Sequence, residues 1–272
     1  MTITVITVCY NAVATIEATI ASVLSQTHPD VEYIIVDGGS ADETLAVIDR
    51  YRDRLAKVIS EPDDGIYDAM NKGLACASGD LITFLNADDR LADETVLARV
   101  ADAAPEGDVI YGDVIVHDPA TGTDSVKSYH GFDKTRFFDD TICQQATFYR
   151  PAAFAACGRF RTAYRIAADM NWLLEAVRRK RPFTHLAFPV AVYDLGGMSG
   201  NPRFAAQLQA ERQEILLRHF SWCERQVYWR LYAKTRRHPS FQRWLRGIMG
   251  WELPSTGKTA KRSRPTSKME PR

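Results

Sequence analysis

Short apolar runs alternate with amphipathic stretches over the first 90 residues of the chain. The opening run ITVITV is rich in β-branched residues and predicts a strand buried on both faces. A helix is predicted next, because apolar residues recur at helical spacing: Ile16, Ile20, Val23 and Leu24. The alternation continues, with strands expected at 33–36, 56–59 and 81–85 and helices from Asp42 towards Tyr51 and over 66–77. Strands that alternate with helices form βαβ units, so the pattern predicts an α/β fold with a mostly parallel sheet.

Two polar clusters directly follow predicted strands. Residues 37–40, DGGS, come after the second strand, and residues 86–89, NADD, come after the fourth. The carboxyl ends of parallel strands lie at one edge of a sheet, and open α/β sheets bind ligands at that edge. Both acidic clusters are therefore expected beside a ligand.

The pattern changes after residue 105. Strands are predicted at 109–116 and 145–149, a helix at 168–180 and an extended segment at 183–193, while 117–140 is polar and irregular. Such decoration after a nucleotide-binding half is expected to build the pocket of a second substrate.

The C-terminal part has a different composition. Helices rich in Arg and aromatic residues are predicted from about residue 203, and a basic tail rich in Ser, Pro and Thr follows from about 254. A tail of this composition is expected to be disordered. The chain is thus predicted to contain a nucleotide-binding domain, a helical extension and a tail, at residues 1–202, 203–253 and 254–272.

The formal net charge of zero conceals an uneven distribution of charge. Beyond residue 200 there are 16 Lys and Arg but 5 Asp and Glu, a local net charge of +11, and the first 200 residues carry −11. This division suggests an acidic body with a basic module. With 46% hydrophobic and 25% charged residues, the chain has the composition of a soluble globular protein.

Cysteines and hydropathy indicate a reducing compartment. The five cysteines are widely spaced, odd in number and without a CxxC pair, which excludes a disulfide framework or a Cys-rich zinc site. The N-terminus shows no basic and apolar signal-peptide pattern, and no apolar run reaches the roughly 18 residues of a spanning helix. A cytoplasmic protein that meets a membrane only from its surface is therefore predicted.

Four sequence blocks occur in an order and spacing that resemble one known family. They are TVCYN, IIVDGGSADET, EPDDGIYDAMNKG and GDLITFLNADD. Together they look like the family 2 glycosyltransferases of the GT-A fold, and the resemblance covers about residues 1–200. It implies a Rossmann-like nucleotide-sugar-binding domain, followed here by the C-terminal helical extension.

The resemblance assigns a nucleotide pocket to residues of the first three blocks. Asp37 would accept hydrogen bonds from the base, which suits an imide N–H because an ionised carboxylate only accepts. Thr7, Cys9 and Asn11 would line the pocket, and Asp64 would lie beside the base or ribose. Simpler interpretations are that Asp37 opens an Asx-turn, Asn11 caps a helix and Asp64 compensates a helix dipole.

The NADD cluster corresponds to the family's metal-binding DxD motif. In relatives this motif binds a divalent cation that bridges the pyrophosphate of the donor, and Mn²⁺ or Mg²⁺ is expected because hard cations prefer oxygen ligands. Asp88 and Asp89 are the predicted metal ligands, and Asn86, Ala87 and Asp88 are predicted to contact the nucleotide-sugar. Asn86 stands where the family has its first Asp, so the charge at that position is lost. A polar loop that caps the next helix is the simpler interpretation.

The segment RIAADMNWLLEA resembles the family's acidic motif at the start of a helix. Asp169 is the candidate general base, since an inverting transfer needs a carboxylate to take the acceptor hydroxyl's proton. The family usually has Glu-Asp here, whereas this chain has Ala168-Asp169. Trp172 could stack on a sugar ring, although a helical Trp more often lies in the core, and a first-turn helix acid is the simpler interpretation of Asp169. Weaker resemblances place residues 143–145, CQQ, near the acceptor and 196–199, GGMS, over the diphosphate.

Basic and aromatic residues are interleaved over residues 218–246, with Trp222, Trp229 and Trp244 among the aromatic ones. This combination suits an amphipathic surface that lies on anionic lipid. A helical cap that packs its aromatics on the body is the alternative. Nucleic-acid binding would fit the composition, but no recognition motif accompanies it, and none is expected.

The sequence therefore predicts a metal-dependent, inverting hexosyl- or hexosaminyltransferase. It would move a sugar from a nucleoside-diphosphate donor, with UDP favoured, to a hydroxyl of a lipid-linked or growing cell-surface glycan. A nucleotidyltransferase would need a Gly-rich basic loop near the first strand, and a Rossmann dehydrogenase a GxGxxG turn there; neither is present. The departures at Asn86 and Ala168 keep one alternative open, a degenerate GT-A-fold protein that serves as a membrane-associated assembly partner.

Overall fold

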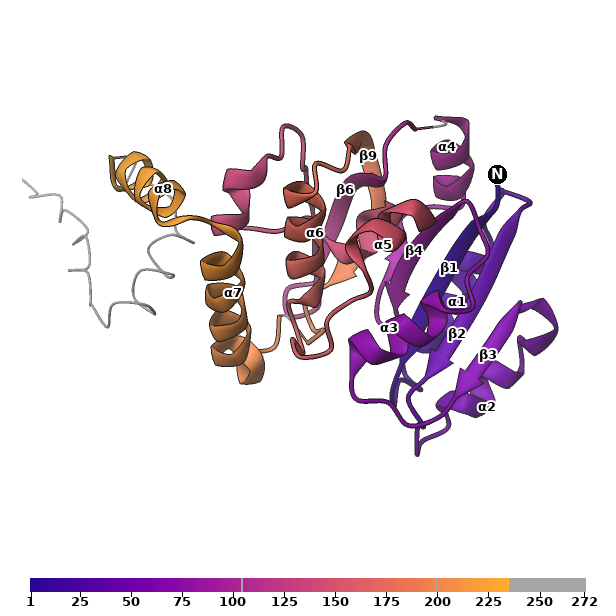
Figure 1. Ribbon diagram of the computed structural model, residues 1–272. Helices are drawn as coiled ribbons and strands as arrows, with labels where there is room; N and C mark the ends of the chain where they lie inside the picture. The colour runs from indigo at the N-terminus through magenta and orange to yellow at the C-terminus, as the bar shows by residue number, and fades with distance from the viewer. Residues whose placement is uncertain (104, 199, 235–272) are drawn as a thin grey trace, which may run out of the picture.

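The computed structural model describes residues 1–103, 105–198 and 200–234. Within them, nine strands form one sheet at the centre of the molecule (Figure 1). The strands are β1 Ile3–Cys9, β2 Val31–Asp37, β3 Lys57–Ser60, β4 Leu81–Asn86, β5 Arg90–Leu91, β6 Val109–Asp118, β7 Thr123–Lys127, β8 Thr147–Tyr149 and β9 Phe183–Asp194. The helices are α1 Ile16–Leu24, α2 Thr44–Asp49, α3 Ile66–Leu74, α4 Val96–Asp102, α5 Pro151–Cys157, α6 Ala168–Arg178, α7 Ala205–His219 and α8 Trp222–Lys234. Four short 3-10 helices are Arg52–Arg54, Lys134–Phe138, Gln144–Ala146 and Pro202–Phe204.

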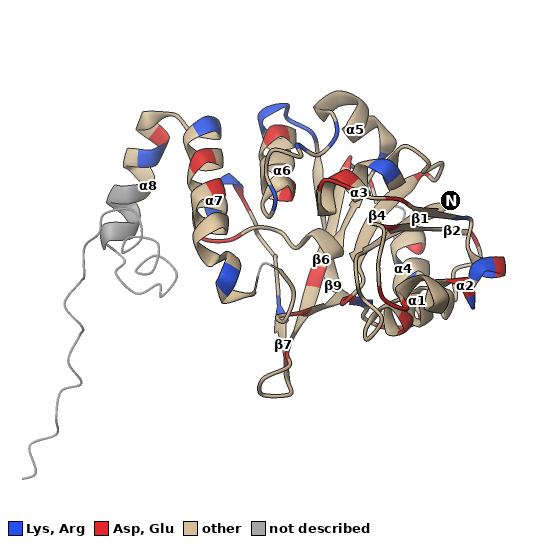
Figure 2. Cartoon of the chain, turned by 90° about the horizontal axis from the view of Figure 1, so that it is seen from below, with Lys and Arg blue, Asp and Glu red and all other residues tan. Residues whose placement is uncertain are grey.

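The first half of the sheet is parallel, as the alternating pattern predicts. β3, β2, β1 and β4 lie in that order and run parallel, with every residue of β1 buried. Helices cover both faces, with α3 and α5 on one side and α1 and α4 on the other (Figure 2). In this register Asp37 lies opposite Cys9, and Asn86 lies opposite Val8. The loops that follow β2 and β4 are therefore neighbours at one edge.

The second half of the sheet is mixed and closes around the loop at 86–89. β8 pairs antiparallel with β4 and β6, while β9 runs parallel to β6. The short β5 comes directly after this loop and pairs antiparallel with β9. The carboxyl end of β9 is thereby brought beside the NADD cluster. β7 was not predicted because its side chains are mostly exposed and polar, so it shows no apolar pattern.

Trp172 lies in the core, so the core interpretation is confirmed and the alternative of stacking on a sugar ring is wrong. Only 2% of it is exposed, and its Nε1 donates to the Gly158 carbonyl at 2.7 Å. Its ring packs edge-on against Tyr149 and tilted against Phe154. An aromatic residue on the buried face of a helix stabilises by burial, and its single polar atom finds a partner.

Helices α7 and α8 pack on the body of the protein. Ile215, Leu216 and Phe220 are buried. Tyr228 stacks on Phe138 with ring centroids 4.0 Å apart and donates to Asp139 Oδ1 at 2.7 Å. Figure 1 shows α7 beside α6, and Ile215, Leu216, Phe220 and Tyr228 belong to the core of the sheet domain.

Only a minority of the C-terminal positive charge lies on these two helices. Between residues 200 and 234 there are six Lys and Arg and three Asp and Glu, and both signs occur on α7 and α8 (Figure 2). Residues 235–253 of the predicted extension and the predicted tail 254–272 lie outside the described residues. No helix in the described part of the chain is long and apolar enough to cross a membrane.

Candidate active site

Two connected cavities open at the carboxyl edge of the parallel strands. The first, here the sheet-edge cavity, has a volume of about 1160 Å³ and lies over the loops after β1, β2 and β4. The second, the inner cavity, has a volume of about 360 Å³ and lies between β6, β9, α6 and α7. Residues that line both are Ile66, Asn86, Asp88, Arg165 and Met198. The NADD cluster therefore stands at the junction of two compartments.

Six of the predicted nucleotide-binding residues line the sheet-edge cavity: Cys9, Asn11, Asp64, Asn86, Ala87 and Asp88. Asn11 has a φ of 49° in the left-handed region, which Asn tolerates better than most residues. Its Oδ1 accepts from the Ala41 amide at 2.9 Å, and its own amide donates to Ser40 Oγ at 2.8 Å. Asn11 thus joins the β1 loop to the β2 loop and does not cap α1.

Asp37 and Thr7 lie beneath the sheet-edge cavity and do not line it. Asp37 is fully buried, and its carboxylate accepts from the Ser40 amide, the Ser40 hydroxyl and Ser60 Oγ. Thr7 is equally buried, and its hydroxyl is hydrogen-bonded to Tyr33 at 3.0 Å. Gly38 and Gly39, which follow Asp37, line the cavity.

Asp88 is the carboxylate at the junction. Burial raises its pKa, and the negative charge of Asp194 at the end of β9 raises it further. A Cβ at Gly197 would lie 2.7 Å from Asp88 Oδ2, so the backbone at Gly197 passes close to this carboxylate. A larger residue at this position would require the Asp88 side chain to move.

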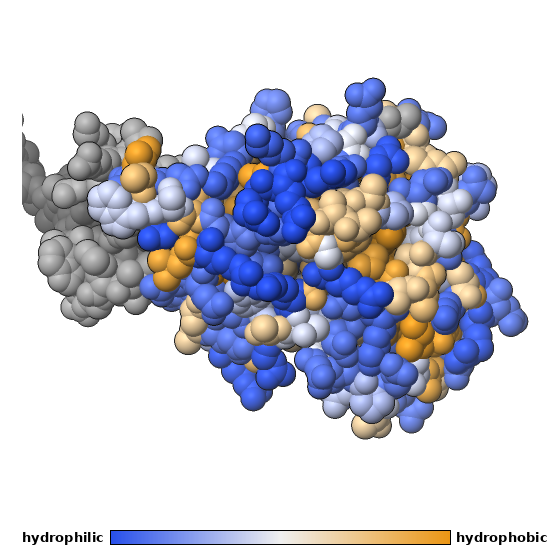
Figure 3. Space-filling view, viewed as in Figure 1, coloured by the Kyte–Doolittle hydropathy of each residue, from blue (hydrophilic) through white to orange (hydrophobic). Residues whose placement is uncertain are grey.

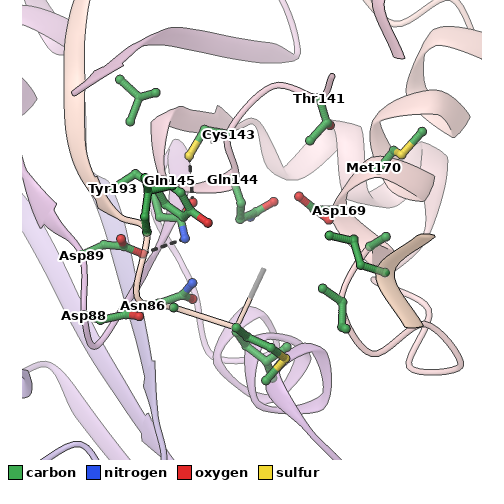
Figure 4. Close-up of a pocket in the computed structure, with 18 of the residues that line it drawn as sticks. Asn86, Asp88, Asp89, Thr141, Cys143, Gln144, Gln145, Asp169, Met170 and Tyr193 are labelled. Atoms are coloured by element: carbon green, nitrogen blue, oxygen red, sulfur yellow. Dashed lines mark hydrogen bonds between the residues drawn. The ribbon is translucent and has the colours of Figure 1, made fainter. Parts of the chain in front are cut away.

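Asp89 has a structural position, although it borders the inner cavity. Its side chain is 1% exposed and accepts from Gln145 Nε2 at 2.7 Å and from the Asp194 amide at 3.0 Å. Burial and the charge of Asp88 raise its pKa well above the ordinary value. With both oxygens engaged, Asp89 ties the NADD cluster to β9 and to the 143–145 segment (Figure 4).

The oxygen atoms at the junction suit a hard divalent cation. Asn86 Oδ1 is buried without a hydrogen-bond partner, and Asp88 is held in a region where negative charge is disfavoured. A cation coordinated by carboxylate and amide oxygens, with the remaining positions filled by phosphate oxygens, would relieve both conditions. Over residues 1–103, 105–198 and 200–234, no group of three or more His, Cys, Asp or Glu side chains could hold a metal ion.

Asp169 lines the inner cavity but not the sheet-edge cavity. It occupies the first turn of α6, where the single hydroxyl proton of Tyr67 is shared between Asp169 Oδ1 and the Ile166 carbonyl, each 2.8 Å from Tyr67 Oη. Burial is the main influence on its pKa, which is raised above the ordinary value. Figure 4 shows Asp169 on one wall of the cavity, with Asn86, Asp88 and Asp89 on the opposite side. The geometry places a carboxylate of raised basicity across from the junction.

Glu211 on α7 holds the segment that precedes Asp169. Its buried carboxylate accepts from the amides of Arg165, Ile166 and Ala167 at 2.9–3.0 Å. These amides belong to the N-terminal approach of α6, where unpaired N–H groups need acceptors. The sequence gives no local sign of this contact, because the partners are about 45 residues apart.

The comparisons with known proteins agree with this architecture. The pattern described as Glycosyl transferase family 2 matches residues 4–163. A PGL/p-HBAD biosynthesis glycosyltransferase of Mycobacterium bovis is 35% identical over 198 residues, which cover 70% of this chain and 75% of the relative. An uncharacterized glycosyltransferase of Mycobacterium tuberculosis is 34% identical over 189 residues, or 67% of this chain and 71% of the relative.

Solved structures show the same fold at low sequence identity. Staphylococcus aureus TarS 1-349 in complex with UDP-GlcNAc has a TM-score of 0.63 at 20% identity, over 90% of this chain and 80% of that one. The mannosyltransferase PcManGT from Pyrobaculum calidifontis, in complex with GDP-Man and Mn²⁺, has a TM-score of 0.58 at 19% identity, over 90% and 68%. The fold is the GT-A fold with added C-terminal helices, and the chain belongs to glycosyl transferase family 2. The protein is accordingly a glycosyltransferase.

Proposed function

We propose that this glycosyltransferase moves a sugar, with inversion, from a nucleoside diphosphate to an acceptor hydroxyl. The observation that carries the proposal is the position of Asp88 between two cavities, only one of which contains Asp169. The nucleotide would occupy the larger sheet-edge cavity, its diphosphate would lie at the junction, and the acceptor would enter the inner cavity. Donor and acceptor would then meet on opposite sides of the transferred sugar.

The chemistry requires a base on the acceptor side. Asp169 would take the proton of the acceptor hydroxyl as its oxygen forms a bond to the anomeric carbon. The bond from that carbon to the diphosphate oxygen breaks at the same time, and the nucleoside diphosphate leaves. Attack from the face opposite the leaving group inverts the anomeric configuration, and the raised pKa of Asp169 makes it a stronger base.

A divalent cation, Mn²⁺ or Mg²⁺, would be held by Asp88 and Asn86 together with diphosphate oxygens. When bound, it would neutralise the charge of the leaving group. The binding of GDP-Man and Mn²⁺ by PcManGT supports this part of the proposal. Asp89 would act by fixing the cluster, because its oxygens are already engaged.

A UDP-sugar carrying a hexose or hexosamine is the proposed donor, and a lipid-linked or growing cell-surface glycan is the proposed acceptor. Structures of TarS with UDP and with UDP-GlcNAc support the nucleotide. The mycobacterial relatives are named for PGL/p-HBAD biosynthesis, which supports a role in the biosynthesis of a glycosylated product. Asp64 and Cys9 would border the nucleotide from the loops after β3 and β1.

The proposal is tested with a panel of UDP-, GDP- and dTDP-sugars in the presence of Mn²⁺ or Mg²⁺. We expect a UDP-sugar to raise the unfolding temperature only with the cation and to be slowly hydrolysed without acceptor. Binding of ligand to the folded state alone raises stability as the logarithm of its concentration over Kd. If no nucleotide sugar binds, donor transfer is contradicted. Binding without any hydrolysis or transfer would favour the alternative of a degenerate assembly partner.

We propose further that the enzyme works in the cytoplasm, against the inner face of the cell membrane. Leu217, Trp222 and Val227 on α7 and α8 are exposed, with Trp222 66% exposed, and Figure 3 shows isolated apolar side chains among hydrophilic ones there. Interfacial aromatics and basic residues together bind anionic lipid without a spanning helix. The buried residues of α7 and α8 pack on the body, as the cap interpretation predicts. Membrane contact would use the exposed residues on other faces of the same helices.

Flotation of the full-length protein with anionic and neutral liposomes tests this contact. We expect flotation with anionic vesicles at low salt, weakening as salt screens the charges. Trp222→Ala should reduce flotation several-fold, whereas Val126→Ala, at a residue 65% exposed on β7, should leave it unchanged. Equal flotation of all forms with neutral vesicles, or none at low salt, would contradict membrane contact. The test uses point variants, because removal of α7 would expose the core.

A further inference from the structure

Arg212 on α7 is a cation that borders the inner cavity with few partners. Its only hydrogen bond in the described part of the chain runs from Nη2 to the Phe137 carbonyl, at 3.3 Å. No carboxylate among the described residues forms an ion pair with it. Burial lowers its pKa more strongly than the neighbouring Asp140, Asp169 and Asp139 raise it. A guanidinium has five N–H donors, so most of its capacity is unused.

Lys127 and Arg150, two other partly buried cations, have close protein partners. Lys127, which also borders the inner cavity, lies 2.6 Å from Asp140. Arg150 donates to the carbonyls of Gly107 and Pro105, both at 2.8 Å. Arg212 is partly exposed and borders the inner cavity, so its N–H groups without a protein acceptor are open to a partner in that cavity.

Arg212 on α7 lines the same cavity as Asp140 and Asp169. Glu211, its neighbour, is fixed by three backbone amides that lead into α6, and these set the orientation of the helix. Arg212 borders the inner cavity but not the sheet-edge cavity, and its charge acts on Asp169. An anion bound there would therefore share the compartment of the proposed acceptor and lie apart from the proposed nucleotide.

We propose that Arg212 binds an anionic group, a carboxylate or a phosphate, on the acceptor of the transfer. The inference rests on the proposed function, because it assumes that the inner cavity receives the acceptor. Arg binds both groups through paired N–H donors, and such charge-assisted bonds are stronger than neutral ones. The acceptor class is then an acidic or phosphorylated glycan, held by its anion at Arg212 with a hydroxyl presented to Asp169. The helix that completes this subsite lies outside the segment matched by the family pattern.

The experiment uses three small probes at constant ionic strength: glucuronate, glucose 1-phosphate and uncharged glucose. Binding of each is titrated calorimetrically to the full-length protein in the presence of UDP and Mn²⁺. We expect at least one anionic probe to bind about tenfold more tightly than glucose, the factor that one charge-assisted bond contributes. Tighter glucuronate identifies a carboxylate, and tighter glucose 1-phosphate identifies a phosphate.

Variants of Arg212 test whether the preference for anionic probes over glucose depends on this side chain. Arg212→Gln should remove it, and Arg212→Lys should retain part of it, because the charge remains without the planar pair of donors. Arg203→Gln, at an exposed arginine outside both cavities, is the matched control and should behave as the parent protein. Affinity for UDP and Mn²⁺ should be unchanged in all three, which also shows that they are folded.

Two outcomes would overturn the inference. One is an equal affinity of the parent protein for charged and uncharged probes, and the other is a preference that persists in Arg212→Gln. A selective loss of UDP affinity in Arg212→Gln would place the anion on the donor and would likewise contradict an acceptor subsite. Failure of the parent protein to bind UDP with Mn²⁺ would contradict the proposed function itself, so the two failures are distinguishable.

Discussion

Asp88→Ala is expected to abolish cation-dependent donor binding. Loss of a residue that merely supports a metal ligand lowers affinity by about 10–100-fold, so loss of a ligand at the junction should exceed about 100-fold. Isothermal titration of UDP at saturating Mn²⁺ measures the change. Asp53→Ala is the control, since Asp53 is exposed and lies in neither cavity. Undiminished Mn²⁺-dependent affinity in Asp88→Ala would contradict the proposed cation site.

Removal of the Asp88 charge should raise the stability of the ligand-free protein, although it lowers donor binding. The folded-state pKa of Asp88 is raised, so ionisation is less favourable in the folded chain than in the unfolded one. Its contribution to stability is therefore lost as pH rises through the folded pKa, and at neutral pH the carboxylate destabilises the ligand-free protein. Asp88→Asn should unfold at a higher temperature than the parent without ligand, yet gain no protection from UDP and Mn²⁺. This pair of results separates lost coordination from misfolding.

The parallel half of the site could be predicted from the sequence because its determinants are local. Each strand is a short buried run, and each functional loop directly follows one, so the neighbourhood of residues 37–40 and 86–89 follows from topology alone. The role of Asp37 was less accessible. Its partner Ser60 lies on β3, and only the packing of β3 beside β2 shows that the carboxylate is already satisfied.

The other half depends on contacts that no local pattern encodes. Asp194 ends β9 and reaches Asp89 across 105 residues, through the pairing of β9 with β5. Glu211 and Arg212 lie in a helix whose composition suggested a basic surface module, although their side chains face the body. Composition describes a segment as a whole, whereas packing decides which face of a helix is buried.

Asp169→Asn is expected to lower turnover by roughly 10²-fold or more while donor affinity stays nearly unchanged. Positioned proton transfer contributes about 10²–10⁴-fold, and asparagine keeps the shape but cannot take the proton. Donor affinity should be retained because Asp169 does not border the sheet-edge cavity. Asp140→Asn is the comparison, since Asp140 borders the same cavity but is paired with Lys127. Near-normal turnover in Asp169→Asn would show that the base lies elsewhere, with Asp140 and then Asp139 as the next candidates.

The pH dependence of turnover tests whether Asp169 is the base, because a hydrogen bond from Tyr67 influences the pKa of Asp169. A general base acts only when deprotonated, so turnover should fall as pH drops through the pKa of Asp169. Burial raises that pKa, which places the acidic limb above the ordinary range of an aspartate, and the hydrogen bond from Tyr67 lowers it in part. Tyr67→Phe removes the lowering contribution and should move the limb to higher pH. Tyr51→Phe, at a tyrosine remote from both cavities, should leave it in place. A limb that is the same in Tyr67→Phe as in the parent would show that the titrating group is not Asp169, because no other carboxylate accepts from the Tyr67 hydroxyl in the described part of the chain.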